Sequence, residues 1–421
     1  MSSLVPEIYV LWHPRCEPGD ALATLIYGWL RPGNGLGPQV FYRSLPAPEA
    51  PPGGLPPPLP GESRSLSAAQ APPPGSNLQV VILLIDAFMI ADPTWRHWIG
   101  QLAREHGAAP RVCLPVALDA TAYNGPVALH ALNFLRPTGV PASGTAQPWA
   151  DDVVDTVSRS LLKQLTETLC DLLLRPDDTP PGAGPGPTLD LARPKVKIFL
   201  SHAKKDGTVP ARRIRDYIYS QTQLAAFYDE NDIPYGSSFS RVLEGNVSGP
   251  TQSAALIAVR SAEYARRPWC RREFSLFRRP LQTPVAGRLA EHWLLNPTLV
   301  VDALAGGVHT PGIPELGNTA AIRWSEDIPA QEEQIVTTVL RDVLLAAFHR
   351  ALGQTVPDGP DHLVLNWLPD PTSLLHIPRI RQAGAGLHVY YPGRGLTGLE
   401  LDTLTDYFPD VEFFSFDRMN P

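Results

Sequence analysis

Cysteine is scarce in this chain of 421 residues, which has four, far apart and with no CxxC pair among them. This spacing predicts isolated thiols in a reducing compartment and favours neither a disulfide framework nor a zinc site. The first residues, MSSLVPEIYV, lack the basic segment that opens a signal peptide. The most apolar run, Val80 to Ile90, is interrupted by Asp86 and is too short to span a bilayer. We therefore expect a soluble cytoplasmic protein with no membrane segment.

Positive charge is outnumbered, with 35 Lys and Arg against 42 Asp and Glu and a net charge of −7. This balance argues against a nucleic-acid partner, because nucleic-acid backbones attract basic proteins. The 43% of hydrophobic and 18% of charged residues indicate a globular protein. The length exceeds what one hydrophobic core usually supports, so two or three domains are expected.

Proline, in contrast, is abundant, and the 47 prolines bunch in the sequence. The stretch 46–75 is rich in Pro, Gly and Ser and is predicted to be an extended, solvated loop. The stretch 176–194 has a similar composition and is predicted to be a linker between domains. Before this linker, apolar residues at helical spacing predict a helix from Asp151 to Leu174. The same spacing predicts another helix from Ala330 to Leu352.

The segment 196–274 contains three motifs in the order VKIFLSHAKKD, LAAFYDENDIPYGSSF and AALIAVRSAEYARRPWCRREF. The first motif reads as a strand that ends in Ser201 and His202. In this order and spacing the motifs resemble the Toll/interleukin-1 receptor (TIR) domain, over roughly 195–353. The resemblance is to the bacterial, NAD-consuming type, whose enzymatic members place their catalytic carboxylate at the position of Glu273.

The first part of the chain, 1–175, resembles a second, degenerate copy of the same domain. EIYVLWHPRCEPGD can be laid over VKIFLSHAKKD, which pairs His13 with the histidine of that motif. NLQVVILLIDAFMIADPTWRHWI can be laid over the third motif, which pairs Trp95 with Trp269. The catalytic position, four residues after Trp95, is then Ile99, so this copy is expected to lack activity. An unrelated α/β domain is the alternative.

Both copies alternate short apolar strands with helices, which is the pattern of a parallel sheet covered on both faces. The remaining residues, 354–421, form either a small third α/β unit or an extension of the second sheet. Their pattern predicts the strands Leu363 to Trp367, Leu387 to Tyr391 and Val411 to Phe416, and a helix from Leu399 to Tyr407. The predicted fold class is therefore α/β, with two tandem TIR-like, flavodoxin-like parallel-sheet domains and a small C-terminal α/β extension. The predicted domains are 1–175 (with the Pro-rich insertion 46–75), 195–353 after the linker 176–194, and 354–421.

Ligands of such sheets bind at the carboxyl ends of the strands. Ser201 and His202, the loop 229–236 and the stretch 260–273 all follow strand ends, so we expect them to converge.

Trp269 and Glu273 are spaced four residues apart, so on a helix they share one face. The nicotinamide ring of NAD can stack on the indole of Trp269, which suits a cationic ring. The carboxylate of Glu273 can stabilise positive charge that develops at the anomeric carbon. One carboxylate is sufficient, because the pyridinium leaves as neutral nicotinamide, whereas ordinary glycosidases need two. The alternative is that Trp269 is a core residue and Glu273 a solvated helix residue paired with Arg or Lys.

Three further features of the sequence suggest binding surfaces or turns. Asp232 and Gly236 lie in a turn-rich acidic loop; in the TIR family this is the BB loop, which covers the nucleotide site, and a plain surface loop is the alternative. Arg260 begins an arginine-rich stretch, 260–288, whose guanidinium groups suit a pyrophosphate or an acidic partner, unless they form only a solvated basic face. The sequence GRGLTG at 393–398 matches a dinucleotide fingerprint, but the chain ends soon after it, which favours a tight strand-to-helix turn.

The resemblance implies a TIR-domain effector of bacterial antiphage immunity that cleaves NAD at the nicotinamide–ribose bond, giving ADP-ribose or a cyclic signalling nucleotide. In this hypothesis Glu273 is catalytic, and the substrate-binding residues are Trp269, Ser201, His202, Asp232, Gly236 and Arg260. NAD is then a substrate with no separate cofactor, and no metal is expected. The resemblance also implies self-association through TIR domains, or contact with a partner effector or sensor protein. The alternatives are a non-enzymatic TIR scaffold that signals through TIR–TIR assembly and a nucleotide hydrolase of related fold.

Overall fold

A computed structural model of the chain describes residues 5–32, 37–43, 56, 59, 78–106, 111–141, 149–174, 196–222, 225–227, 253–285, 287–304, 313–317, 319–382 and 386–418. The chain divides into two compact units, and each is described by itself. Unit 1 comprises Met1–Thr168 and Asp177–Leu189, and unit 2 comprises Leu169–Pro176 and Asp190–Pro421. The boundary between the units falls inside helix α4 (Asp151–Leu173). This helix confirms the one predicted from the apolar spacing in this region.

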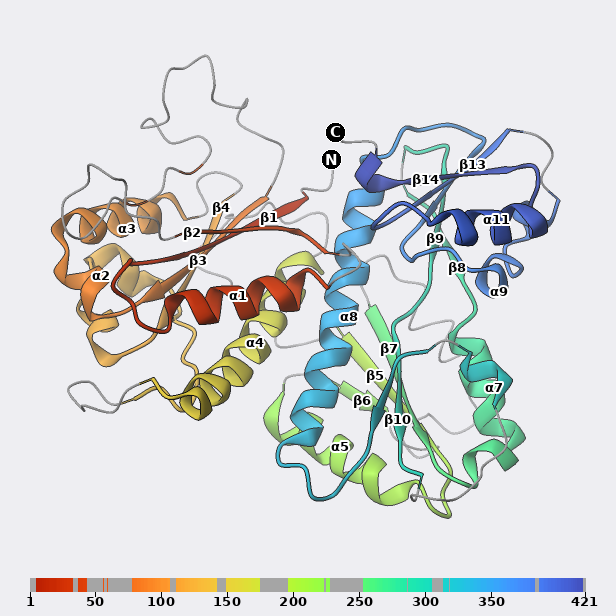
Figure 1. Cartoon of the computed structure of the whole chain (residues 1–421), viewed down its shortest axis with the longest axis horizontal. Helices are drawn as coiled ribbons and strands as arrows, with labels where there is room; N and C mark the ends of the chain where they lie inside the picture. Colours follow the sequence, from red (N-terminus) through yellow and green to blue (C-terminus); the bar gives the residue numbers. More distant parts are fainter. Residues whose placement is uncertain are drawn as a thin grey trace. The chain divides into compact units, whose positions relative to one another are not determined.

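Unit 1 is built on a parallel sheet, sheet A, with the strand order β2-β1-β3-β4 among the described residues (Figure 1). The strands are β1 (Pro6–Trp12), β2 (Gln39–Arg43), β3 (Leu78–Ile85) and β4 (Arg111–Ala117). The central strands β1 and β3 are almost wholly apolar and buried, as strands covered on both faces are.

Helices cover both faces of sheet A. On one face, α1 (Gly19–Leu30) lies beside α4, and Trp29 Nε1 donates to Thr166 Oγ1 at 3.0 Å. On the other face lie α2 (Ala87–Ala91) and α3 (Pro93–Glu105), followed after β4 by the short helices η1 (Ala120–Asn124) and η2 (Val127–Ala131).

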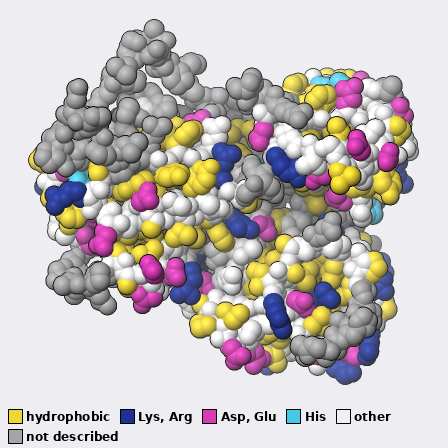
Figure 2. Space-filling model, viewed as in Figure 1, with side chains coloured by type: hydrophobic (Ala, Val, Ile, Leu, Met, Phe, Trp, Pro, Cys, Tyr) yellow, Lys and Arg dark blue, Asp and Glu magenta, His cyan; other side chains and the backbone are white. Residues whose placement is uncertain are grey.

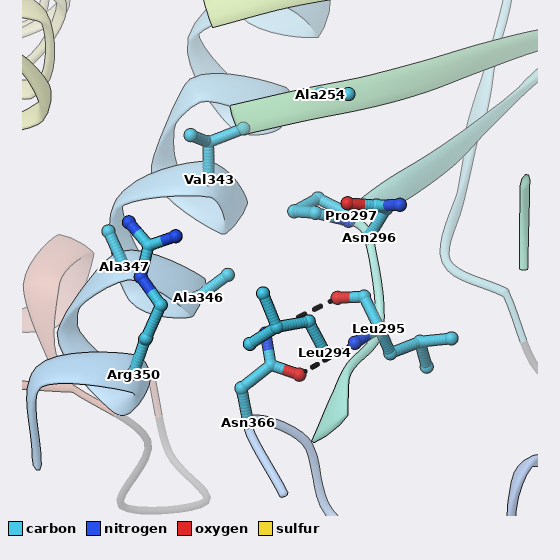
Figure 3. Close-up of a pocket in the computed structure, with 10 residues that line it drawn as sticks. All are labelled: Ala254, Leu294, Leu295, Asn296, Pro297, Val343, Ala346, Ala347, Arg350 and Asn366. Atoms are coloured by element: carbon cyan, nitrogen blue, oxygen red, sulfur yellow. Dashed lines mark hydrogen bonds between the residues drawn. The ribbon is translucent and has the colours of Figure 1, made fainter. Parts of the chain in front are cut away.

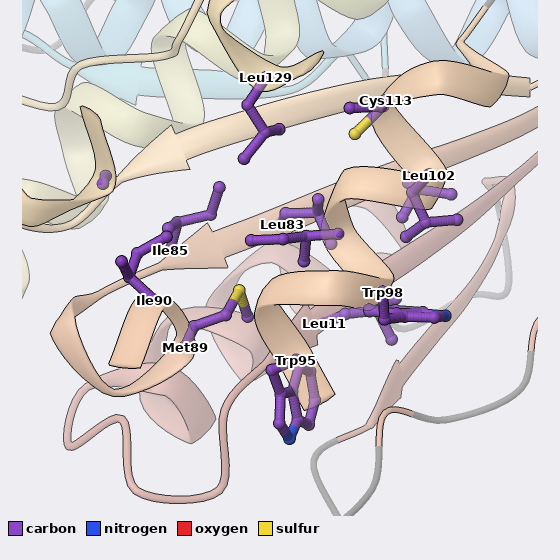
Figure 4. Close-up of a cluster of buried hydrophobic side chains, with 14 of the residues drawn as sticks. Leu11, Leu83, Ile85, Met89, Ile90, Trp95, Trp98, Leu102, Cys113 and Leu129 are labelled. Atoms are coloured by element: carbon purple, nitrogen blue, oxygen red, sulfur yellow. The ribbon is translucent and has the colours of Figure 1, made fainter. Parts of the chain in front are cut away.

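The core between sheet A and α3 is centred on two tryptophans. Trp95 and Trp98 are buried and meet edge to face, with ring centroids 5.7 Å apart. They belong to one buried cluster with Leu102 of α3, Leu11 of β1, and Leu83 and Ile85 of β3 (Figure 4). Edge-to-face aromatic pairs add about 0.5–1.5 kcal/mol to the stability that burial of their surface provides.

The prediction of a solvated loop at 46–75 is wrong for the residues of this stretch that the structure describes. Pro56 and Leu59 are buried, and Leu59 belongs to the same core as Trp95. Composition could not show this, because one leucine among prolines has no periodic pattern, yet its burial stabilises by ~1.5–3 kcal/mol. The rest of 46–75 and the predicted linker 176–194 lie outside the described residues.

The described residues of unit 2 form two sheets, of which the first, sheet B, is parallel with the order β11-β10-β7-β5-β6. Its strands are β5 (Val196–His202), β6 (Ala225–Phe227), β7 (Ser253–Arg260), β10 (Thr298–Asp302) and β11 (Ala321–Arg323). Helices α5 (Thr208–Gln221) and α8 (Gln331–Gly353) lie on one face, and α7 (Pro268–Phe277) lies on the other (Figure 1). On the α7 side, Phe274 and Phe277 pack against Phe199 of β5. The helix predicted at the end of this domain is confirmed as α8.

The second sheet of unit 2, sheet C, has the order β14-β13-β12-β9-β8, with β8 antiparallel at the edge. Its strands are β8 (Leu281–Thr283), β9 (Glu291–Leu294), β12 (His362–Leu365), β13 (Leu387–Tyr391) and β14 (Val411–Ser415). One face packs against α9 (Pro371–Leu374), α10 (Pro378–Arg381) and α11 (Gly398–Tyr407). The strands and the helix predicted within 354–421 are confirmed. However, β8 and β9 come from 281–294, inside the predicted domain 195–353, so sheet C is not an extension of sheet B.

The chain passes from sheet C to sheet B in one short step, because β9 ends at Leu294 and β10 begins at Thr298. Asn366, just after β12, fixes this step: it accepts from Leu295 N–H at 2.8 Å, and its amide donates to Leu295 O at 3.4 Å (Figure 3). Helix α8 contacts strands of both sheets. It approaches sheet C so closely that a Cβ at Gly353 would lie 2.8 Å from Val364 Cγ1.

Sheets A and B share the strand order that the predicted repeat requires: β2-β1-β3-β4 corresponds in chain order to β6-β5-β7-β10. The aligned side chains differ, since Trp95 is buried while Trp269 is 50% exposed. This order also occurs in many unrelated α/β domains. The α/β fold class is therefore confirmed, while the repeat remains a prediction.

Two further observations concern the described residues as a whole. None of their helices has the length and hydropathy that crossing a membrane requires. The four cysteine side chains are buried, and none of them forms a disulfide.

Candidate functional site

Two of the predicted site residues meet at the carboxyl edge of sheet B. Ser201 is the penultimate residue of β5, and Glu273 lies in the second turn of α7, which follows β7. The Ser201 hydroxyl donates to Glu273 Oε2 at 2.8 Å. Ser201 is 4% exposed and Glu273 is half-buried, so the carboxylate combines a fixed partner inside the protein with access from solvent.

Tyr264, which we did not predict, extends this hydrogen-bonded group. It opens the short helix η4 (Tyr264–Arg266) after β7, and its hydroxyl lies 3.0 Å from Ser201 Oγ and 3.3 Å from Cys270 O. The side chain is fully buried, and burial raises the pKa of the phenol above its usual value. The only sequence signal was a tyrosine placed shortly after a strand end, which is too common to single out a residue.

His202 and Cys270, which flank the Ser201–Tyr264 contact, are joined by a hydrogen bond. His202, the last residue of β5, is half-buried, and its carbonyl oxygen accepts a hydrogen bond from Cys270 Sγ at 3.5 Å. Burial raises the pKa of the Cys270 thiol to about 12. The thiol is therefore protonated at neutral pH and does not act as a nucleophile, because the thiolate is the reactive form.

Asp206 ties the loop after β5 to the loop after β7. Its carboxylate accepts from Ser261 Oγ at 2.5 Å and from the backbone N–H of Glu263 at 2.9 Å. Glu263 in turn accepts from Lys205 at 3.2 Å and from Arg266 at 3.1 Å, and the hydrogen bond from Lys205 is the main cause of its lowered pKa. Such charge-assisted bonds hold the start of η4 against the end of β5.

The interpretation of Trp269 as a core residue is wrong. Trp269 lies in the first turn of α7 and is 50% exposed, four residues before Glu273. Helix α7 can begin there because Pro268 occupies its first turn, where a missing backbone N–H costs nothing. A half-exposed indole therefore lies one helical turn from the candidate carboxylate.

The arginine-rich stretch 260–288 is largely paired within unit 2. The guanidinium of Arg260 lies 3.9 Å from the carboxylate of Asp302 at the end of β10, on the side of β7 away from β5. Arg271 donates two hydrogen bonds to Glu315 Oε1, at 2.8 and 2.5 Å. Further contacts join Arg266 to Glu263, Arg278 to Thr319 and Arg288 to Asp358.

The arginines of this stretch whose side chains are exposed are Arg266, Arg267, Arg272 and Arg279. Figure 2 shows basic side chains gathered at the edge of unit 2 beside α7, with acidic side chains among them. Among its described residues, the arginine-rich stretch 260–288 therefore contains few guanidinium groups that both face solvent and are not held by a carboxylate. Asp232 and Gly236, the predicted lid residues, lie outside the described residues.

The GRGLTG sequence at 393–398 forms a strand-to-helix turn whose polar groups are bonded within the turn. Gly393 has φ 89°, in the left-handed region that favours glycine. Thr397 and Glu400 form a capping box at the start of α11, and Arg394 donates to both oxygens of Glu400, at 2.8 and 2.7 Å. The bond from Arg394 lowers the pKa of Glu400 to about 2. A carboxylate thus occupies the helix N-terminus that a pyrophosphate would use, which favours a structural turn.

The cavity of Figure 3 is separate from Glu273. It has a volume of about 30 Å³ and room for about one water. It lies between α8 and the β9–β10 step, and its lining residues are Ala254, Leu294, Leu295, Asn296, Pro297, Val343, Ala346, Ala347, Arg350 and Asn366. Within the part of the chain that the structure describes, no group of three or more His, Cys, Asp or Glu side chains is arranged to hold a metal ion.

The family of this segment follows from its sequence and its site together. A family model for the TIR domain matches residues 198–291, which run from β5 through α7 to the first residue of β9. The chain contains a TIR domain. The match includes Ser201, Tyr264, Trp269 and Glu273, while β10 and β11 continue the same sheet beyond the matched residues and α8 packs on it.

Comparisons with whole proteins do not extend this family assignment beyond the TIR domain. No curated protein matches the chain. Among solved structures it is similar to the C-terminal domain of glucosamine-fructose-6-phosphate aminotransferase from Francisella tularensis, at 9% identity and a TM-score of 0.17, over 85% of this chain and 87% of that one. A likeness this low carries no argument about the fold or the activity of the TIR-domain protein.

Proposed function

We propose that the TIR domain cleaves the nicotinamide–ribose bond of NAD, releasing nicotinamide and leaving ADP-ribose or a cyclic nucleotide. The observation that carries this proposal is the 2.8 Å hydrogen bond from buried Ser201 to half-buried Glu273. A catalytic group has to be held in one geometry before the substrate arrives, and a buried hydroxyl on a central strand provides that.

The roles of the other residues follow from their exposure. The indole of Trp269 is open to solvent and can stack on the nicotinamide ring. The carboxylate of Glu273 stabilises the positive charge that develops at the anomeric carbon, while Ser201 and His202 form the floor of the site. Arg260 is a weaker substrate contact than the sequence suggests, because Asp302 already faces its guanidinium. Asp232 and Gly236 keep their proposed role as a lid, and a role in bacterial antiphage immunity rests on the resemblance alone.

Incubation of the purified full chain with NAD tests this function. We expect NAD to be consumed and nicotinamide to appear in equal amount, because one nicotinamide leaves for each bond broken. Mass spectrometry of the second product distinguishes linear from cyclic, since ring closure leaves out the water that hydrolysis adds. NAD that stays intact at high protein concentration and long incubation contradicts the proposal.

We also propose that the TIR domain self-associates, and one observation favours this role. Trp269 is exposed in the same helix as Arg272, and tryptophan and arginine are among the residues enriched where protein surfaces bind each other. Assembly without loss of NAD is the behaviour of the alternative function, a non-enzymatic TIR scaffold.

Charge reversal of Arg272 tests self-association. In the wild type, specific activity should rise with protein concentration and fall with added salt, because exposed charges are screened. Arg272→Glu should raise the concentration needed for assembly about tenfold, as loss of ~1.4 kcal/mol does. Arg272 is a better choice than Arg271 for this test. Charge reversal of Arg271 would place two carboxylates side by side, because Arg271 is paired with Glu315.

Light scattering and activity over one dilution series provide the measurement. Arg212→Glu, on α5 at the opposite face of sheet B, is the matched control and should leave the assembly concentration unchanged. A constant specific activity with only monomer present at every dilution contradicts self-association.

A further inference from the structure

The hydroxyl of Tyr264 is buried beside Ser201 and Cys270. Its side chain is fully buried, and its oxygen has two neighbours: Ser201 Oγ at 3.0 Å and Cys270 O at 3.3 Å. A tyrosine in such a place could have been a phenylalanine without any loss of packing, and burial of its hydroxyl is tolerated only because that hydroxyl is hydrogen-bonded.

The direction of these hydrogen bonds follows from counting protons. An ionised carboxylate only accepts, so the single proton of Ser201 goes to Glu273 at 2.8 Å. The contact between Ser201 and Tyr264 then needs a proton from Tyr264, because Ser201 has none left to give. Both hydroxyls therefore point their protons toward the carboxylate when Glu273 is ionised.

Protonation of Glu273 reverses the order. The carboxyl proton can then be donated to Ser201, the Ser201 proton to Tyr264, and the Tyr264 proton to Cys270 O. Every group is satisfied in both arrangements, but only the first ends on a negative charge. Charge-assisted hydrogen bonds are about twice as strong as neutral ones, and each bond in a chain strengthens the next.

We propose that Tyr264 is a positioning residue, which acts through Ser201 to hold Glu273 ionised and in one orientation. This inference rests on the proposed NAD cleavage for its reaction, but the hydrogen-bond relay itself can be measured separately. Tyr264 does not touch the substrate, because its hydroxyl is fully enclosed by the protein.

Other charged and titratable groups also surround the relay, and they set the background against which it acts. Arg271 is paired with Glu315 Oε1, and Asp206 accepts from Ser261 Oγ and from the backbone N–H of Glu263. The groups that face the relay are Cys270, Arg267 and Arg271 on the α7 side, Glu315 from η5 (Pro314–Leu316), and His202 and Asp206 from β5 and the loop after it. Tyr264→Phe leaves all of these side chains in place.

Tyr264→Phe is the first test, because it removes one oxygen and keeps the ring. We expect kcat for NAD to fall about tenfold with KM changed less than about twofold, since substrate contacts are kept. The acid side of the pH–rate profile should move up by about half a pH unit, because the carboxylate loses the strengthening of its bond from Ser201. Tyr407→Phe, an exposed tyrosine on α11, is the matched control and should change neither quantity.

A double variant separates the relay from a general structural effect. If Tyr264 acts through Ser201, then Tyr264→Phe added to Ser201→Ala should cost almost nothing more than Ser201→Ala alone. Full additivity of the two losses, or a pH–rate profile that does not move in Tyr264→Phe, overturns the inference.

Failure of the proposed function is recognised by a separate measurement. If the wild type does not cleave NAD, the same two variants are compared by the free energy of unfolding in urea at neutral pH. Effects that are smaller together than their sum support the relay and reject only the NAD activity, whereas additive effects reject the relay as well.

Discussion

Glu273→Gln should lower the rate of NAD cleavage about a thousandfold or more and leave the fold intact. The substitution removes the negative charge that stabilises the developing cation, and the loss of such a preorganised interaction costs about 4 kcal/mol in the transition state. Glutamine is chosen because its amide oxygen can still accept the hydrogen bond from Ser201. Alanine would remove this acceptor as well as the charge, so a loss of activity could not be assigned to the charge alone.

The measurement is nicotinamide release by the purified full chain, with the melting temperature taken for each variant. Glu326→Gln is the matched control, since Glu326 is an exposed carboxylate between β11 and α8. It should retain wild-type activity. A Glu273→Gln variant that keeps most of its turnover would remove Glu273 from the mechanism, whatever happens to the other residues.

Acid should destabilise unit 2 through two buried histidines. His292 of β9 and His349 of α8 are 4% and 5% exposed, and burial is the main reason why the pKa of each is lowered to about 4. Their usual pKa in an unfolded chain is about 6.5. Between these values the unfolded chain binds protons that the folded chain does not, so stability falls as the pH drops from about 6.5 to about 4 and levels off below that.

The expected loss is ~3 kcal/mol for each histidine, or about 5 kcal/mol for both between pH 7 and 4.5. Carboxylates whose pKa values are lowered, such as Glu400 at about 2, lose their contribution only below about pH 4.5, so the two effects separate. Urea unfolding at both pH values measures the loss, and hydrogen exchange in α8 assigns it to unit 2.

Substitution of one histidine provides the internal check. His349→Gln removes one titrating group, and it should lower the pH dependence by roughly half. His97→Gln, an exposed position on α3 of unit 1, is the matched control and should leave the pH dependence unchanged. A free energy of unfolding of unit 2 that stays constant between these pH values would contradict the prediction.

The order of helices and strands was largely readable from the sequence, because it depends on local spacing. Apolar residues at helical intervals gave α4 and α8 nearly to the residue, and the three strands and the helix within 354–421 formed as predicted. The meeting of Ser201 and Glu273 was also predictable, because carboxyl ends of parallel strands share one edge of a sheet.

Long-range pairing was not readable, because spacing along the chain does not show which distant residue a side chain or strand meets. Arg271 looked available for a ligand until Glu315 was seen beside it, 44 residues later in the chain. Strands β8 and β9 lie in the sequence inside the predicted domain 195–353, and only the pairing of β9 with β12, and of β8 with β9, assigns them to sheet C. Tyr264 was missed for the same reason, since its importance comes from Ser201, which is 63 residues away.

The interleaving of sheets B and C has a consequence for inheritance. The hairpin β8–β9 lies between α7 and β10 in the chain, yet its hydrogen-bond partner β12 comes after α8. No single cut in the gene therefore separates the two sheets. A truncation after α8 would strip β9 of β12 and expose the edge that carries His292 and Trp293. Sheet C therefore cannot be gained or lost by insertion or deletion of one continuous segment. Changes in sheet C and in the TIR domain have to remain compatible with each other.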